Sequence, residues 1–481
     1  MATIMKPPAR EWGSFLDGAW TLEGEMVDIR SPYGGSLAGT IHRATAEQAG
    51  AAVRAAQRAF ETTRRMPSFE RQRILREISA GIQARREEFA RLMALEAGKP
   101  IRTARAEVER AIFTFAVASE EAVRIGGEWL PLDLQPSTAG RAGIVRRFPL
   151  GPILGITPFN FPLNLVAHKV APAIAAGCTI IVKPAPKTPL CALLLAEIAE
   201  KAGVPAGALN VLPLSDPDAE RLVADDRLKL LSFTGSGPVG WSLKAKAGKK
   251  KVVLELGGNA AVIVHSDADI EDAARKCVQG GFSYAGQSCI SVQRIFVQSA
   301  VETMFLETLI AGVRQLKVGD PLDEATDVGP LIDESAARRA EAWIEEAVSA
   351  GAKLLCGGKR KGSILEPAVL THTQPQMKVN CQEVFAPVVI VEPYDDFADA
   401  IHRVNDSPYG LQAGVFTRDA KLLFKAFEEL EVGGVIAGDM SSFRIDHMPY
   451  GGVKESGLGR EGLRYAIEEM TEPRLLVLNL G

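Results

Sequence analysis

One thiol and one carboxylate of this chain stand out because each lies in a short segment rich in glycine and polar residues. Cys289 lies in GGFSYAGQSCISVQR (residues 280–294), and Glu255 lies in VVLELGGN (residues 252–259). A thiol nucleophile and a carboxylate base form a coherent pair for chemistry on a carbonyl group. Each also has a structural explanation, because a lone cysteine is most often a small buried side chain and a glutamate before two glycines usually ends a strand.

The segments that must position these two residues alternate between strands and helices. We predict strands at 153–157, 179–183, 209–212, 229–234 and 251–254, with helices at 163–175, 189–201, 216–224 and 237–247. A second alternating region has predicted strands at 261–264, 294–297, 368–371, 388–391 and 414–417, with helices at 336–350 and 420–430. Short apolar strands separated by helices indicate parallel sheets covered on both faces, whose ligands bind beyond the carboxyl ends of the strands.

The remaining segments flank these two regions. Residues 1–42 predict loops and a few strands, and amphipathic helices are predicted at 46–62, 68–97 and 103–124. Residues 128–148 predict a hairpin that leaves the helical body. The segment 473–481, PRLLVLNLG, predicts an apolar strand whose exposed edge would pair with another chain. We therefore expect an α/β fold with two doubly wound parallel-sheet domains and a small β oligomerisation arm.

Composition excludes several classes of protein. Of 481 residues, 47% are hydrophobic and 24% charged, and the net charge of −4 gives no reason to expect nucleic acid or an anionic membrane as a partner. The first 30 residues lack an apolar run, so we expect no signal peptide, and no apolar stretch is long enough to span a membrane. The six cysteines lie singly, without a CxxC pair, which predicts a reducing, cytoplasmic location and no metal site.

Seven segments resemble the aldehyde dehydrogenase superfamily and occur in that family's order. They are PFNFP (158–162), VKPAPKTP (182–189), FTGS (233–236), ELGGN (255–259), GQSC (286–289), EVFAP (383–387) and PYGGVKESGLGREG (449–462). The resemblance covers most of the chain and is closest to the lactaldehyde/phosphonoacetaldehyde-type branch. It implies a Rossmann-like cofactor domain (1–127 with 149–257), a catalytic domain (258–452), an arm (128–148 with 468–481) and a return segment (453–467).

The resemblance implies oxidation of a small-molecule aldehyde to a carboxylate with NAD or NADP. Cys289 would attack the aldehyde, hydride would pass to the nicotinamide, and water activated by Glu255 would hydrolyse the resulting thioester. Asn160, between Pro158 and Pro162, would stabilise the oxyanion together with the backbone amide of Cys289, and one such side-chain donor is worth roughly 3 kcal/mol. Without the resemblance, an asparagine in a proline-rich loop would be read as a turn residue.

The cofactor site is predicted partly from the residues and partly from the resemblance. Gly235, Gly237 and Gly240 satisfy G-x-G-x-x-G between a predicted strand and a helix, although a plain helix start capped by Ser236 explains the pattern about as well. By resemblance, Lys183 binds the adenosine ribose. Glu383 and Phe385 hold the nicotinamide ribose and ring. The full implied set is Thr157, Pro158, Lys183, Pro186, Gly235, Ser236, Leu256, Glu383 and Phe385.

Cofactor choice is where the sequence departs from the NAD-preferring pattern. Many NAD-specific relatives carry a glutamate three residues after the ribose-binding lysine, but here that position is Pro186, followed by Lys187. We therefore predict tolerance of both NAD and NADP. Lys187 could approach a 2′-phosphate, and it is equally well explained as a solvated side chain.

The predicted substrate pocket is formed by Arg110, Phe161, Ser288, Ile290, Arg444 and His447. An arginine and a histidine in such a loop are more often structural than ligands for an anion. Relatives that bind phosphorylated or phosphonate aldehydes often carry arginine where this chain has Ser288, which argues against a strongly anionic substrate.

Three further interpretations concern the class of protein and its assembly. An acylating relative that forms acyl-CoA is disfavoured because the relatives of that kind lack a glutamate at the position of Glu255. A non-catalytic structural or binding protein would have no need for Cys289, Glu255, Asn160 and Lys183 together. We expect a homodimer or homotetramer.

Overall fold

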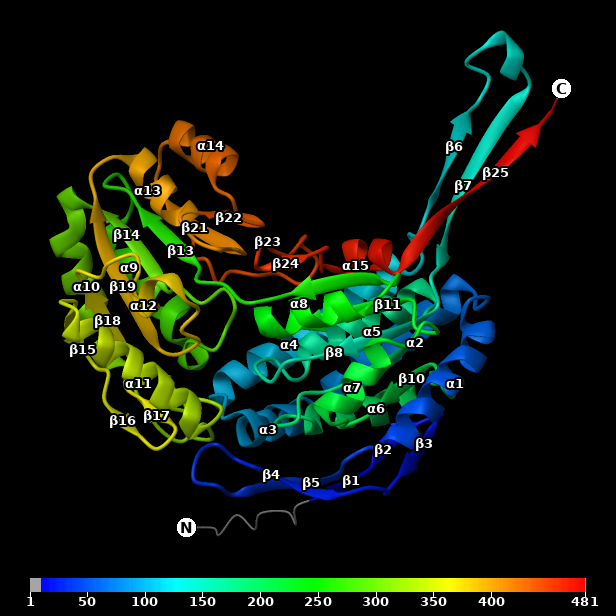
Figure 1. The fold of residues 1–481 in the computed structure, drawn as a ribbon, viewed down its shortest axis with the longest axis horizontal. Coiled ribbons are helices and arrows are strands. Elements are labelled where there is room, and N and C mark those ends of the chain that lie inside the picture. The colour runs from blue at the N-terminus through cyan, green and yellow to red at the C-terminus, as the bar shows by residue number, and fades with distance from the viewer. Residues whose placement is uncertain (1–9, 481) are drawn as a thin grey trace.

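A computed structural model describes residues 10–480, and two large sheets organise them (Figure 1). Residues 1–9 and 481, which fall within the predicted first domain and the predicted last strand, lie outside this range. The first sheet has the order β24-β12-β11-β8-β9-β10-β2-β3. Its parallel strands are β8 (Pro152–Ile156), β9 (Thr179–Lys183), β10 (Leu209–Val211), β11 (Leu230–Thr234) and β12 (Lys251–Glu255), and its antiparallel additions are β2 (Ser14–Leu16), β3 (Ala19–Thr21) and β24 (Gly457–Leu458).

Helices cover both faces of this sheet because its central strands are apolar on both sides. Neighbouring residues Ile153 and Leu154 of β8 point into two different hydrophobic cores. One core takes residues from α2 (Ser68–Ala84), α3 (Arg86–Ala97), α4 (Ile101–Glu121), α5 (Asn164–Ala176), α6 (Leu190–Lys201) and α15 (Leu463–Glu469). The other takes residues from α1 (Ala46–Thr63), α7 (Asp216–Val223) and α8 (Gly237–Lys246).

The single long helix predicted over 68–97 is wrong, since the chain forms two helices there. The break lies at Arg85, whose φ of −111° and ψ of 20° are not helical. The Arg85 guanidinium binds Glu88 at 2.7 Å and Glu197 of α6 at 2.9 Å, so the break is stabilised by ion pairs. The other helices of this sheet begin and end within two or three residues of their predicted positions.

The second sheet has the order β15-β18-β19-β14-β13-β21-β22 and carries its own helices. All of its neighbours are parallel except β15 (Lys353–Cys356), and its other strands are β13 (Ala261–Val264), β14 (Arg294–Gln298), β18 (Ala368–Thr371), β19 (Val388–Tyr394), β21 (Gln412–Phe416) and β22 (Gly434–Ala437). Its helices are α9 (Ile270–Phe282), α10 (Glu302–Gln315), α11 (Glu334–Ser349), α12 (Lys378–Cys381), α13 (Phe397–Asn405) and α14 (Ala420–Glu429). The predicted α/β fold with two parallel-sheet units is confirmed, and the chain passes between them through residues 256–260.

A three-stranded ribbon projects from this body (Figure 1). It has the order β25-β7-β6 and consists of β6 (Gly127–Pro131), β7 (Arg141–Pro149) and β25 (Thr471–Asn479). β25 pairs along its whole length with β7 of the same chain, and it is the edge strand of this sheet, so pairing of its outer edge with another chain stays a prediction. The smaller sheets are β1 (Glu11–Trp12), β5 (Leu37–His42) and β4 (Met26–Arg30); β16 (Arg360–Lys361) and β17 (Ile364–Leu365); and β20 (Tyr409–Gly410) and β23 (Val453–Lys454). None of the helices within 10–480 is long and apolar enough to cross a membrane.

Candidate active site

A cavity of about 1010 Å³ lies beyond the carboxyl ends of β8, β9, β11 and β12. This is where parallel α/β sheets place their ligands, because helix N-termini and strand ends meet there. Its wall also takes residues from the second sheet's connections, so the two units share one site. Cys289, Glu255 and Asn160 all line it, although they come from segments far apart in the chain.

A strained turn delivers Cys289 to this cavity. Directly after α9, Tyr284, Ala285 and Gly286 take left-handed φ values of 49°, 52° and 69°. Such conformations cost free energy for residues other than glycine, and they cluster at functional sites. A side chain on Gly286 would clash with the carbonyl oxygen of Ala386, so the position accepts only glycine.

The Cys289 thiol is half-buried and has one polar side-chain neighbour among the described residues. Its Sγ lies 3.0 Å from the Tyr450 hydroxyl oxygen. Burial raises the pKa of the Cys289 thiol to about 11, while the Tyr450 hydrogen bond and the positive charge of Arg444 oppose the rise. The Cys289 thiol is therefore mostly protonated at neutral pH, and the two neighbouring groups that favour its thiolate form are Tyr450 and Arg444.

Glu255 is the last residue of β12 and is buried, with 3% of its surface exposed. Neither of its carboxylate oxygens has a hydrogen-bond partner among residues 10–480. Burial, reinforced by the negative charge of Glu461, raises its pKa well above the ordinary value, and Arg444 and Lys169 only partly offset this. A carboxylate with a raised pKa and no fixed partner binds a proton more readily than an ordinary carboxylate, which suits a general base.

Asn160 lies in the loop between β8 and α5 and is also buried. Its Nδ2 donates to the carbonyl oxygen of Gln287 at 3.0 Å, two residues before the cysteine. The loop itself is fixed by Glu107, whose carboxylate accepts from the backbone N–H groups of Leu163 and Asn164, both at 3.0 Å. The amide is thus held beside the cysteine loop by buried hydrogen bonds.

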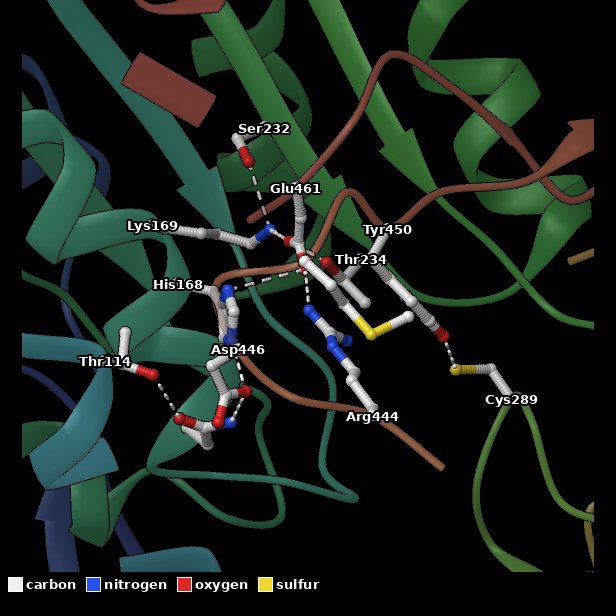
Figure 2. Close-up of polar contacts among 12 residues, drawn as sticks. Thr114, His168, Lys169, Ser232, Thr234, Cys289, Arg444, Asp446, Tyr450 and Glu461 are labelled. Carbon is white, nitrogen blue, oxygen red and sulfur yellow. Dashed lines mark hydrogen bonds and ion pairs between the residues drawn. The ribbon is translucent and has the colours of Figure 1, made fainter. Parts of the chain in front are cut away.

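A chain of buried charges leads from α5 to the cysteine (Figure 2). Lys169 donates to Ser232 and Thr234 and pairs with Glu461 at 3.4 Å. Glu461 also accepts from Arg444 at 2.9 Å, and the Arg444 guanidinium stacks over the Tyr450 ring, 3.6 Å from its centroid. Burial alone would raise the pKa of Glu461, but Lys169, His168 and Arg444 together bring it below its ordinary value.

A second carboxylate, Asp446, anchors the other side of the wall. It accepts from Arg110 at 2.7 and 3.1 Å, from Asn164 at 3.0 Å, and bonds His168 Nε2 at 2.8 Å. Burial opposes its ionisation, but His168 and Arg110 lower its pKa further than burial raises it. Two of the three arginines that line the cavity, Arg110 and Arg444, are therefore paired with a buried carboxylate.

Residues implied in cofactor binding line the same cavity. They are Thr157, Pro158, Lys183, Pro186, Gly235, Ser236, Leu256, Glu383 and Phe385. Ser236 is the N-cap of α8, its hydroxyl makes no capping bond, and it lines the cavity together with Pro238 and Val239 of the first helical turn. An anion fits at such a helix start. Gly240 permits close packing there, since a side chain on it would clash with Leu256. These features fit the pyrophosphate of a dinucleotide.

Glu383 and Phe385, which also line the cavity, are each held in place by a contact with a neighbouring residue. Glu383 accepts from the Gly258 N–H at 3.0 Å, and burial raises its pKa to about 7. Phe385 takes a left-handed φ of 52°, and its ring meets Phe159 edge-on with centroids 5.8 Å apart. A strained aromatic residue at a cavity wall is typical of a ligand-contacting position.

The structure separates the predicted pocket residues into two groups. Arg110, Phe161, Ser288, Ile290 and Arg444 line the cavity. His447 does not: it is exposed and its ring packs edge-on against Phe113 with a centroid distance of 5.9 Å. The structure places His447 outside the cavity because the 441–449 loop turns its side chain outward, whereas Arg444 turns inward to Glu461.

Several residues of the site were not identified by the sequence motifs. Tyr450 and Glu461 lie in PYGGVKESGLGREG, but only their contacts identify them as neighbours of the thiol and of Arg444. His168 and Lys169 are charged or polar residues in α5, every residue of which is buried. Two such side chains within an apolar helix signal an internal polar network. Asp216 lines the cavity beside Lys183, and no feature of the sequence pointed to it.

Comparison with known proteins gives one consistent result. A family model described as the aldehyde dehydrogenase family matches residues 20–476. The chain is 46% identical over 472 residues to a 3-sulfolactaldehyde dehydrogenase of Priestia aryabhattai, covering 98% of both chains. It is similar to the crystal structure of aldehyde dehydrogenase 21 from Physcomitrella patens in complex with the reaction product succinate, at 45% identity and a TM-score of 0.97, covering 98% of this chain and 99% of that one. It also resembles the glyceraldehyde-3-phosphate dehydrogenase GapN of Methanocaldococcus jannaschii complexed with NADP, at 40% identity and a TM-score of 0.92, covering 95% and 100%.

Proposed function

The chain belongs to the aldehyde dehydrogenase family, and we propose that Cys289, Asn160 and Glu255 carry out its NAD(P)-dependent oxidation of an aldehyde to a carboxylate. The observation that supports this most strongly is that the three side chains line one cavity with the residues that suit a dinucleotide. Three polar groups from distant segments, each with a constrained environment, fit the roles of nucleophile, oxyanion donor and base.

The proposed reaction begins when the Cys289 thiolate adds to the carbonyl carbon. A C–S bond forms, the carbonyl electron pair moves to oxygen, and the oxyanion accepts hydrogen bonds from Asn160 Nδ2 and the Cys289 backbone N–H. The bound nicotinamide ring supplies the acceptor for the hydride that leaves this carbon. The product on the enzyme is a thioester of Cys289.

Glu255 acts as the general base in hydrolysis of that thioester. Its carboxylate takes a proton from water, the hydroxide adds to the thioester carbon, and the C–S bond breaks with the thiolate as leaving group. The carboxylic acid product and the Glu255 proton then leave to solvent. Formation of acyl-CoA, the alternative outcome, would need no base at this position, so buried Glu255 favours hydrolysis.

The test is a pair of cysteine variants. Cys289→Ser should lose aldehyde-dependent formation of NAD(P)H while retaining cofactor binding, because the thiol is needed only for the chemistry. Cys381→Ser is the matched control, since Cys381 is also partly exposed but does not line the cavity. Oxidation that survives in Cys289→Ser, or is lost in Cys381→Ser, would refute the assignment.

We further propose a short aldehyde with a singly charged or hydroxylated tail as substrate. Arg110 and Arg444 line the wall near the thiol, and two of the three similar proteins named above are a 3-sulfolactaldehyde dehydrogenase and an aldehyde dehydrogenase in complex with succinate. Because each arginine already pairs with a buried carboxylate, their combined pull on a multiply charged tail is limited. The assay compares kcat/KM for a semialdehyde with that for its neutral methyl ester, and equal values would refute this proposal.

We also propose that the chain forms a homodimer or homotetramer in a reducing, cytoplasmic setting. Apolar side chains on both faces of the arm are at least half exposed, among them Trp129 (61%), Leu475 (54%) and Leu476 (57%). Exposed apolar area of this kind is typical of a surface that another chain covers. Light scattering of the protein and of Leu476→Lys tests this, and a wild-type monomer at micromolar concentration would refute it. Within 10–480 all six cysteines are unpaired, as a reducing compartment requires.

A further inference from the structure

We propose that Asp216 sets cofactor choice by accepting hydrogen bonds from the adenosine ribose and repelling a 2′-phosphate, so that this protein prefers NAD to NADP. The inference rests on the proposed function in one respect, that the cavity binds the dinucleotide with its nicotinamide near Cys289. It goes beyond that function because it assigns the selection of cofactor to a residue outside the motifs.

The position of the adenosine follows from the shape of the site. The nicotinamide must lie beside Cys289 because the hydride leaves the carbon bound to that sulfur. The N-terminus of α8, with Ser236, suits the pyrophosphate. The adenosine half must then occupy the remaining end, which lies between α7 and α8. Ala219, Val239 and Leu243 line this end and provide an apolar slot for the adenine ring.

Two charged side chains lie at the rim of this slot. Lys183 ends β9, and Asp216 opens α7, the helix that follows the neighbouring strand β10. Lys183 Nζ lies 2.5 Å from Asp216 Oδ1. The Lys183 side chain is 5% exposed and therefore fixed, whereas that of Asp216 is 80% exposed and open to a ligand. An ammonium donor beside a carboxylate acceptor matches the two hydroxyl groups of a ribose.

Asp216 is not occupied by the usual task of an acidic residue at a helix start. Ser215 is the N-cap of α7, and its hydroxyl accepts from the Asp218 N–H. The Asp216 carboxylate is thus left to face the cavity. In dinucleotide-binding α/β folds an acidic residue near the adenosine typically binds the ribose 2′-hydroxyl of NAD, whereas an arginine accommodates the phosphate of NADP. Asp216 supplies the carboxylate that Pro186 does not.

The charges around this rim disfavour a phosphate. Asp216 and Glu220 both line it, and a 2′-phosphate would add a charge of about −1.5 to −2 beside them. The nearby cations are already paired, Lys183 with Asp216 and Lys246 with Glu220. Lys187, which could have approached the phosphate, instead binds Asp333 and does not line the cavity. Pro186 alone predicts that the protein accepts both NAD and NADP. The charges at this rim instead favour NAD over NADP.

The experiment measures binding and turnover separately. Calorimetry gives the Kd of NAD and of NADP for the wild type, Asp216→Asn and the control Asp218→Asn, and kcat/KM is measured with both cofactors. Asp218 lies on the same helix and carries the same charge, but it does not line the cavity. Asn keeps the size of the side chain and removes its charge.

We expect the wild type to bind NAD about tenfold or more tightly than NADP. A charged hydrogen bond of this kind corresponds to roughly ten- to a hundredfold in affinity, so Asp216→Asn should lower the NAD:NADP ratio of affinities by about that factor. Asp218→Asn should leave the ratio unchanged. A wild type with equal affinities, or a ratio that Asp216→Asn does not move, would overturn the role of Asp216 even if aldehyde oxidation is intact. Binding of neither cofactor would overturn the proposed function as well.

Discussion

The Tyr450 hydroxyl should control the reactivity of the thiol, and removing it tests the geometry of the site. In the structure this hydroxyl lies 3.0 Å from Cys289 Sγ and stabilises the thiolate, because an O–H group can donate to the anion. Its loss in Tyr450→Phe removes a hydrogen bond to a charged group, worth about 1.5–3 kcal/mol. Since one pH unit corresponds to about 1.36 kcal/mol, the thiol pKa, already raised to about 11 by burial, should rise by about one to two further units.

The magnitude expected in an alkylation assay is smaller than that change in thiolate population. A thiol of higher pKa is a better nucleophile once ionised, with a Brønsted slope of about 0.4–0.5, so about half of the loss is recovered. The rate of iodoacetamide inactivation at fixed pH should therefore fall about three- to tenfold, and its pH profile should move to higher pH. Tyr394→Phe is the control, since its hydroxyl bonds His265 at 3.0 Å and does not line the cavity. Superimposable pH profiles of Tyr450→Phe and wild type would refute the reasoning.

Three other variants test the remaining roles. Glu255→Gln should release a burst of NAD(P)H and then stall at the thioester, and steady turnover near the wild-type rate would assign the base to another residue. In the wild type, hydrolysis should accelerate as pH rises, because the raised pKa of Glu255 means that its carboxylate form appears only at higher pH. Asn160→Ala should lower kcat about a hundredfold, the loss of one oxyanion donor, with little change in cofactor affinity, and an unchanged kcat would exclude that role. Pro186→Glu should move the ratio of kcat/KM further toward NAD, and a fixed ratio would show that position 186 does not contribute.

The sequence predicts the elements of this fold well because their patterns are local. The five parallel strands of the first sheet are short apolar runs separated by amphipathic helices, and a local pattern of that kind determines the element and its approximate ends. The break at Arg85 was not predictable, because it depends on Glu197 more than a hundred residues away. The partner of β25 could not be predicted for the same reason, since an apolar strand does not reveal which edge it joins.

The same distinction between local patterns and tertiary contacts applies to the residues of the site. Cys289, Glu255 and Asn160 lie in recognisable motifs, so their presence in one cavity could be predicted. The contact between Tyr450 and the thiol depends on a loop near the end of the chain, and the pairing of Asp216 with Lys183 joins the start of α7 to the end of β9. The outward turn of His447 likewise depends on packing against Phe113. Such contacts arise from tertiary packing and carry no local signal.

The net charge of the side chains beside the thiol supports the proposal of a substrate tail with a single negative charge. Among the paired side chains beside the thiol, three are cationic and two anionic in the resting state: Arg110, Lys169 and Arg444 against Asp446 and Glu461. Burial and the negative charge of Glu461 raise the pKa of Glu255 well above its ordinary value, which disfavours a third anion among these groups. One positive charge is thus in excess, which suits a tail with a single negative charge and opposes one with two. When Glu255 ionises to activate water, it removes this excess. The carboxylate product then meets these groups without an excess positive charge, so the same ionisation that drives hydrolysis also weakens the hold on the product.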